Sequence, residues 1–122
     1  MASGLFDEYP NLKVILGHLG AGLPFGIWRV DHRISRGSGT PKAKLPMSHY
    51  LRENFYITTS GNFHTPALAN VILEVGADRI LYSVDYPYED VVEAGEWLGQ
   101  ASSSESDRMK IARINSQKLF RL

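Results

Sequence analysis

Two ionisable side chains follow short apolar stretches of this sequence and could do acid–base or metal chemistry. His18 comes directly after residues 12–17, and Asp85 comes directly after residues 80–84. In α/β proteins, the loops that follow buried parallel strands face the ligand. An aspartate there can bind a metal ion or move a proton, and a histidine is a natural acid–base group. Because neighbouring strand ends of a parallel sheet open onto one cleft, we predict that His18 and Asp85 share a site.

Each of these residues also has a structural interpretation. Asp85 could cap a helix that starts near Pro87, and the residues alone leave both roles open. His18 could be a turn histidine bonded to a carbonyl, but the glycine-rich stretch 17–22 lets a ligand approach the backbone, which favours a functional role. That stretch lacks the glycine spacing of a dinucleotide site and the lysine of a P-loop, so we expect neither.

Several aromatic and charged side chains could line the same cleft. Tyr86, Pro87 and Tyr88 could form an aromatic wall for a planar ligand, although core packing explains them almost as well. Phe63 and His64 follow the second apolar stretch. Arg29 stands beside Trp28 in a charged cluster that, on the residues alone, is more typical of a solvated helix face.

The elements that must position these residues alternate along the chain. Apolar, β-prone stretches at residues 12–16, 55–59 and 80–84 predict three strands. Helical spacing and capping signals predict helices between and after them, at about residues 23–35, 46–53, 65–76, 88–99 and 105–120. Thr65 is the expected N-cap of its helix, with Pro66 at the first position. The pattern is βαβαβ with parallel strands, and three strands cannot close a barrel alone.

Composition narrows the class of protein. The 122 residues suit one modest domain, and the formal net charge is zero, so neither nucleic acid nor an anionic membrane is an expected partner. No apolar stretch approaches the roughly 20 residues that span a bilayer. The first residues lack the features of a signal peptide, and there is no cysteine for disulfides or thiolate sites. We therefore expect a cytoplasmic protein.

Three segments resemble one family. Residues 12–20, 54–63 and 83–89 are similar to the decarboxylases of the amidohydrolase superfamily, which include aminocarboxymuconate-semialdehyde and γ-resorcylate decarboxylases. Within this group the chain most resembles fungal 2,3-dihydroxybenzoate decarboxylases, and the resemblance covers essentially the whole chain. It implies an α/β fold in which residues 1–122 are the C-terminal portion of a metal-dependent TIM barrel, holding its last three βα units, strands six to eight. It also implies a non-oxidative decarboxylase (carboxy-lyase) of hydroxybenzoates.

The resemblance further implies roles for individual residues. Asp85 would ligate a divalent ion (zinc, manganese or magnesium) and protonate the ring carbon that loses carbon dioxide. His18 would belong to a proton relay beside it. Arg29 would reach a neighbouring subunit's site in a homo-oligomer. Tyr88 would pack against the aromatic carboxylate substrate, and we expect Pro87 and Phe63 there as well.

Two departures from the family pattern limit what this chain can do alone. The other metal ligands of the family have no counterpart here, so metal affinity should be poor. Ala21 stands where the family has a glutamate that would orient the histidine. We therefore expect the isolated chain to be inactive. Alternatives are a non-catalytic fragment that self-associates or pairs with a full-length relative, through the Arg29 helix or the open strand at residues 12–16, and a hydrolase of the same superfamily.

Overall fold

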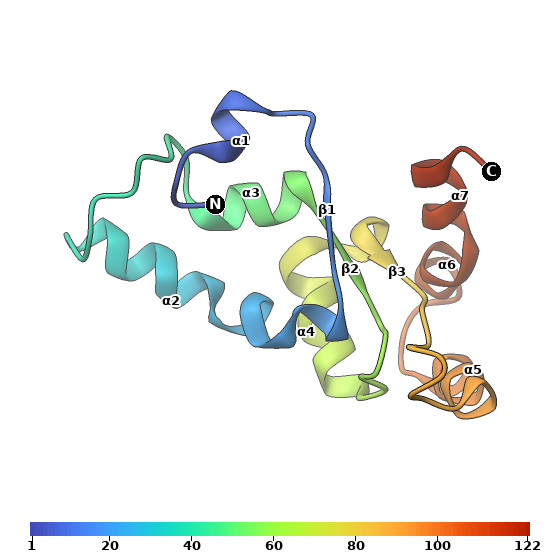
Figure 1. Cartoon of the computed structure of the whole chain (residues 1–122). Coiled ribbons are helices and arrows are strands. Elements are labelled where there is room, and N and C mark those ends of the chain that lie inside the picture. Colours follow the sequence, from blue (N-terminus) through green and yellow to red (C-terminus); the bar gives the residue numbers. More distant parts are fainter.

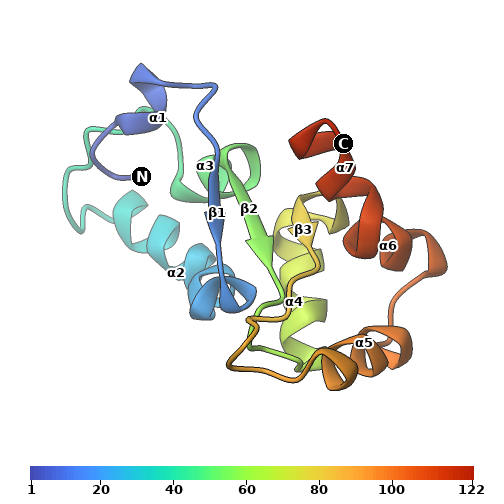
Figure 2. The same ribbon diagram turned by 45° about the vertical axis from the view of Figure 1, so that its right-hand side comes forward.

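A small parallel sheet organises the molecule. The computed structural model of residues 1–122 has three strands in the order β1 (Val14–Leu16), β2 (Phe55–Thr58) and β3 (Ile80–Leu81). All pairs are parallel, with Ile15 opposite Tyr56 and Ile57 opposite Ile80. The strands lie side by side in Figures 1 and 2, with helices connecting them. The predicted βαβαβ order and parallel pairing are confirmed.

Helices account for most of the remaining chain. They are α1 (Leu5–Glu8), α2 (Leu23–Ser35), α3 (Met47–Asn54), α4 (Thr65–Val75), α5 (Val91–Gln100), α6 (Glu105–Met109) and α7 (Asn115–Phe120). A π-helical turn, Lys110–Ile114, joins α6 to α7, and short 3₁₀ segments occupy His18–Gly22 and Ala77–Arg79. None of the helices combines the length and apolar character that crossing a bilayer requires.

The hydrophobic core lies between the sheet and these helices. Ile57 of β2 and Ile80 of β3 are completely buried, and α2, α3 and α4 pack against one another beside them. The fully buried aliphatic side chains come from every layer: Ile27, Leu51, Ile57, Leu68, Val71, Ile80 and Ile111. Figures 1 and 2 both show α6 and α7 beside β3, at the side of the sheet away from β1.

The two edges of the sheet differ. The Thr59 N–H donates to the Leu81 carbonyl, so the backbone N–H and carbonyl groups of Leu81 face β2. The backbone groups of Ile80 and Tyr82 therefore face away from β2. There the buried Asn115 amide donates to the Ile80 carbonyl (2.8 Å) and the Ala77 carbonyl (2.7 Å), while the Tyr82 N–H donates to the Ile111 carbonyl (2.9 Å). The outer edge of β3 is therefore covered by the C-terminal helices, whereas β1 has no such cover.

Element ends differ from the prediction for identifiable reasons. β3 stops at Leu81 instead of residue 84, because Ser83 bonds through both its N–H and its carbonyl to the Thr59 hydroxyl and not to a neighbouring strand. α5 starts at Val91 instead of residue 88. The α4 helix begins at Thr65 itself, so Pro66 is its second residue, and the Thr65 hydroxyl accepts from the Trp97 indole instead of capping.

Candidate active site at the carboxyl ends of the strands

His18 and Asp85 lie next to each other where the strands end. The distance from His18 Nδ1 to Asp85 Oδ2 is 4.0 Å, and the two side chains are 58% and 36% exposed. His18 is held by the 3₁₀ segment after β1, and Asp85 by the loop after β3. Between them lies the end of β2. The chain thus brings its two candidate acid–base groups to one edge of the sheet, as their positions after the strands predict.

The orientation of the His18 ring follows from a hydrogen bond. His18 Nδ1 lies 2.7 Å from the Ser60 carbonyl oxygen, which can only accept, so Nδ1 carries the proton. In the neutral imidazole, Nε2 is then the nitrogen free to take up a proton. The Asn62 amide also donates to the His18 carbonyl (3.3 Å). Although Ala21 supplies no carboxylate, the Ser60 carbonyl provides His18 with an orienting partner.

Gly61 allows the two side chains to approach. A Cβ atom at this position would lie 3.0 Å from Asp85 Oδ2 and 3.0 Å from His18 Nδ1. Most real Cβ contacts are longer than this, so any other residue would make one of the two side chains shift by a few tenths of an ångström. Gly61 also has a φ of 62°, which glycine adopts without strain. Sequence reasoning missed this residue, although a glycine in the turn that follows the second strand was a usable signal.

The backbone at both candidate residues is unusual. His18 has a φ of 55° and Asp85 a φ of 84°, both in the left-handed region. Leu19 and Ala21, in the same 3₁₀ segment, also have positive φ values. Side-chain-bearing residues occupy this region at a cost of roughly 1–2 kcal/mol each. Such strain persists where surrounding contacts impose it, and it clusters at functional sites.

The helix-cap interpretation of Asp85 is wrong, because another residue fills that role. Asp90 Oδ1 accepts from the Val92 N–H (2.7 Å) and the Glu93 N–H (2.9 Å) and caps α5. Asp85 accepts from Tyr88 and Glu89 only through its backbone carbonyl. Its carboxylate is thus free for a ligand or a proton.

The expected substrate-binding residues are not all gathered at this pair. Tyr88 is 86% exposed, and Pro87 is exposed beside it. Phe63 is half-buried and packs on Trp97 of α5, with ring centroids 5.6 Å apart. Arg29 is exposed on α2 and belongs to none of the ion pairs of the chain. Phe63 therefore has a packing role of its own, and Arg29 points to no partner within this chain.

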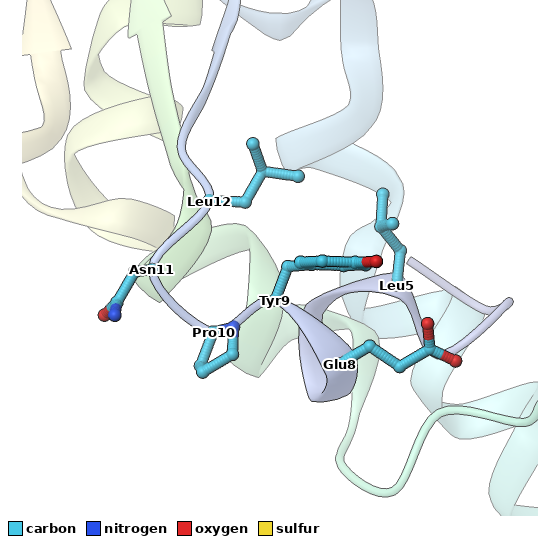
Figure 3. Close-up of a pocket in the computed structure, with 6 residues that line it drawn as sticks. All are labelled: Leu5, Glu8, Tyr9, Pro10, Asn11 and Leu12. Atoms are coloured by element: carbon cyan, nitrogen blue, oxygen red, sulfur yellow. The ribbon is translucent and has the colours of Figure 1, made fainter.

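The largest hollow of the surface lies elsewhere. A cavity of about 620 Å³ opens between α1 and the segment leading into β1 (Figure 3), lined by Leu5, Glu8, Tyr9, Pro10, Asn11 and Leu12. It adjoins the amino end of the strand, where parallel α/β proteins seldom carry chemistry. A smaller cavity of about 380 Å³ lies nearer to the candidate pair, and Asn62 and His64 are among its lining residues. The candidate pair itself stands on an open surface.

The donor atoms present suit only part of a metal site. A carboxylate oxygen from Asp85 is a good ligand for a divalent ion such as Mn²⁺. However, the chain contains no group of three His, Cys, Asp or Glu side chains that could hold an ion. Catalytic ions usually have three or more protein ligands. Asp85 therefore fits as one member of a larger ligand set.

Comparison with known proteins identifies the family of this chain. A family model described as amidohydrolase matches residues 1–122. This chain belongs to the amidohydrolase family. The resemblance noted in the sequence is confirmed, and the three parallel βα units of this amidohydrolase chain are part of a TIM barrel. The expected partial barrel is thus also confirmed.

Individual relatives agree with the family model. The amidohydrolase chain is 55% identical to γ-resorcylate decarboxylase of Polaromonas sp. (strain JS666) and 52% identical to that of Rhizobium sp. (strain MTP-10005), each over 124 residues. These alignments cover 100% of this chain and 38% of each relative, so the chain spans well under half of their length.

Solved structures give the same picture. A 2,6-dihydroxybenzoate decarboxylase complexed with 2,6-dihydroxybenzoate superposes with a TM-score of 0.94 at 52% identity, covering 100% of this chain and 38% of that one. A dihydroxybenzoic acid decarboxylase from Polaromonas sp. JS666, with bound manganese and 2-nitroresorcinol, gives 0.93 at 54% identity, covering 99% and 37%.

Proposed function

We propose that residues 1–122 form the C-terminal portion, strands six to eight, of a metal-dependent, non-oxidative hydroxybenzoate decarboxylase. The observation that carries the proposal is the His18–Asp85 pair at the strand ends, within a chain similar over its whole length to γ-resorcylate decarboxylases. γ-Resorcylate is 2,6-dihydroxybenzoate, the compound bound in one similar structure. We therefore propose the 2,6 isomer as substrate, with the 2,3 isomer suggested by the sequence as the comparator.

Asp85 would contribute one ligand to the divalent ion. Manganese is bound in one of the similar structures, and a carboxylate oxygen suits that ion. When bound, the ion supplies positive charge that holds the oxygens of the substrate. The remaining ligands must come from outside these residues, because the chain holds no group of three His, Cys, Asp or Glu side chains that could bind an ion.

The proposed reaction needs a proton at the ring carbon. The Asp85 carboxyl group would deliver it, forming a C–H bond with an electron pair of the ring. The bond from that carbon to the carboxylate then breaks, its electron pair restores the aromatic ring, and carbon dioxide leaves. At 4.0 Å, His18 and Asp85 are too far apart for a direct hydrogen bond. A proton therefore passes between them only through a group lying between the two side chains.

The other side chains would bind the substrate. Tyr88 and Pro87 offer exposed apolar surface to an aromatic ring beside Asp85. The Arg29 guanidinium, free of ion pairs, suits the carboxylate of a substrate held in a neighbouring subunit's site. Phe63 would contribute indirectly to the substrate site, since its ring packs on Trp97. In the isolated chain Tyr88, Pro87 and Arg29 face water, so we propose that it does not turn over substrate.

A chimera tests this proposal. This chain replaces the corresponding segment of the Polaromonas γ-resorcylate decarboxylase, and the protein is assayed with Mn²⁺ for release of carbon dioxide. We expect conversion of 2,6-dihydroxybenzoate, slower conversion of the 2,3 isomer, and none by the isolated chain. A folded chimera without activity on either isomer contradicts the proposal, and ester or amide hydrolysis without carbon dioxide release would favour a hydrolase.

The free edge of β1 favours a second, non-catalytic candidate. Ile15 in the middle of β1 is 47% exposed, and no segment of the chain covers this edge. Unpaired strand edges pair with other chains. We propose that the isolated chain self-associates through β1, or pairs with a full-length relative there. Because β3 is covered, β1-to-β1 pairing would stop at a dimer. Ile15→Lys should then shift the mass in solution from the dimer toward 13.6 kDa, and an unchanged mass would contradict this candidate.

A further inference from the structure

A small polar cavity lies at the amino ends of β2 and β3, at the opposite end of the strands from His18 and Asp85. Its volume is about 250 Å³, and its lining residues are Tyr56, Asp78, Arg79, Asn115 and Lys118. The first of these belongs to β2, the next two come directly before β3, and the last two belong to α7. The cavity therefore joins the beginnings of two strands to the C-terminal helix.

The buried amide of Asn115 has an unused acceptor at this cavity. The residue is only 3% exposed, and its Nδ2 donates to the Ala77 and Ile80 carbonyls, while no group of the chain donates to its Oδ1. The enclosed side-chain polar atoms without a partner are Ser103 Oγ and Arg108 Nε, so Asn115 Oδ1 is not sealed inside the protein. This oxygen therefore opens onto the cavity, where a ligand can donate to it.

Positive charge is left over in the same cavity. The two carboxylates nearby each have a cation, since Asp78 Oδ2 accepts from Lys110 Nζ (2.9 Å) and Glu53 lies 3.6 Å from Arg79. Lys118 takes part in no ion pair. Its ammonium is the one charge of the lining without a counterion, so the cavity favours an anion.

The polar groups around the cavity are held in place by other parts of the chain. Arg79 Cζ lies over the Tyr56 ring, 5.1 Å from its centroid, which is a cation–π contact. The two hydrogen bonds from Asn115 Nδ2 fix the direction of its Oδ1. A ligand therefore meets groups that are already ordered, and this lowers the entropy cost of binding.

We propose that this cavity binds hydrogen phosphate. The ligand must offer negative oxygens to Lys118 and Arg79 and an O–H group to Asn115 Oδ1, which can only accept. Hydrogen phosphate has both at neutral pH. Sulfate has the same tetrahedral shape but no proton, so it would leave Oδ1 without a partner. A cavity of about 250 Å³ also leaves room for water beside an ion of this size.

The proposed site binds a ligand and does no chemistry. It lies at the amino ends of the strands, where parallel α/β proteins seldom carry catalytic groups. It does not depend on the proposed decarboxylase activity, which needs the opposite ends of the strands. Because the ion would connect β2 and β3 to α7, phosphate should stabilise the folded chain by mass action.

Calorimetric titration of the chain with inorganic phosphate tests the proposal. Sulfate and methyl phosphate are the comparators, at constant ionic strength and about pH 8, where all three are chiefly dianions and only phosphate keeps an O–H. We expect saturable binding to one site, at least about tenfold tighter in Kd for phosphate than for either comparator. Phosphate should also raise the temperature of thermal unfolding measured by circular dichroism.

A matched pair of variants locates the site. Lys118→Met removes the unpaired charge but keeps an unbranched side chain, and Arg113→Met is the control at an exposed cation without an ion pair. Lys118→Met should weaken phosphate binding at least about fivefold, and Arg113→Met should bind as the wild type does. In ¹H–¹⁵N spectra, the Asn115 side-chain amide should be among the signals that phosphate shifts.

Two results would overturn the site itself. They are the absence of saturable phosphate binding to the wild type and unchanged binding by Lys118→Met. Equal affinity for phosphate, sulfate and methyl phosphate would overturn the selection of hydrogen phosphate by Asn115 Oδ1. None of these outcomes bears on the His18–Asp85 site, which the chimera tests separately.

Discussion

Gly61 controls the distance between the two ionisable side chains of the candidate site. Its missing Cβ leaves room for Asp85 Oδ2 and His18 Nδ1, each 3.0 Å from where that atom would be. The three residues come from the ends of three different strands, so their contact depends on the register of the whole sheet. A change at Gly61 tests that geometry without removing either ionisable group.

We predict that Gly61→Ala destabilises the chain by about 1–2 kcal/mol, because alanine at a φ of 62° is strained and its Cβ contacts both side chains. Gly99→Ala is the matched control. Gly99 lies exposed in α5 with no atom near its Cβ position, so alanine should stabilise the helix by up to about 1 kcal/mol. Urea unfolding measures both, and equal effects of the two substitutions would argue against the close approach at Gly61.

Part of the site could be predicted at this scale. His18 and Asp85 stand directly after apolar stretches, and that local signal was enough to bring them together. The choice between cap and ligand at Asp85 was not local, because it depended on whether Asp90 caps α5. Gly61 was missed because the need for a glycine arises from two side chains distant in sequence.

At the scale of elements, Asn115 links the C-terminal helices to the sheet. Its buried amide donates to the carbonyls of Ala77 and Ile80. We predict that Asn115→Leu, which keeps the branching of the side chain, costs about 2–3 kcal/mol of unfolding free energy, because it leaves two buried carbonyls unpaired. The exposed Asn11→Leu should change stability by less than about 0.5 kcal/mol. If chemical denaturation gave Asn115→Leu the same free energy of unfolding as the wild type, these hydrogen bonds would not hold β3.

A second link between elements predicts a pH dependence. The Tyr50 hydroxyl donates to Asp7 Oδ1 (2.7 Å) and the Lys44 N–H donates to Asp7 Oδ2 (3.0 Å), and these bonds lower the pKa of Asp7 below its usual value. A lowered pKa stabilises the fold at pH values above the ordinary one, and this stabilisation is lost as pH falls through the folded pKa. Burial, and then the bond to Asp7, raises the pKa of Tyr50. Its contribution is present below about pH 10 and lost as pH rises.

We therefore predict that Asp7→Asn unfolds with a weaker dependence on pH below about pH 4 than the wild type. Thermal unfolding across that range is the measurement. Tyr50→Phe, which removes the main donor to Asp7, should likewise weaken the pH dependence of unfolding below about pH 4. If thermal unfolding of the wild type and of Asp7→Asn depended on pH in the same way below about pH 4, this contact would not be formed in solution.

Strand order and the places of the longer helices followed from periodicity, but the number of helices and the element ends did not. The Thr59 hydroxyl takes up both backbone groups of Ser83 and ends β3 early. The π turn at Lys110–Ile114 positions the Ile111 carbonyl near Tyr82. No pattern in the sequence predicted this turn. In each case the hydrogen bonds involved join residues that are distant in sequence.

At the scale of the whole molecule, three βα units of an amidohydrolase barrel carry a partial site. The chain spans 38% of its curated relatives, and its candidate pair faces open solvent. The sequence resemblance identified the family because each of the three motifs at the strand ends is a short, continuous segment of sequence. Substrate isomer and assembly also depend on residues outside the three motifs.

Our central claim is that Asp85 is a catalytic residue in a hydroxybenzoate decarboxylase. The most direct test compares Asp85→Asn with Asp90→Asn in the chimera with the Polaromonas enzyme, measuring kcat for 2,6-dihydroxybenzoate with Mn²⁺. We predict that Asp85→Asn lowers kcat by at least about 10²-fold, because the proton donor is lost. Asp90→Asn should stay close to the parent, since asparagine caps α5 equally well. Full activity of the Asp85→Asn protein would contradict the account.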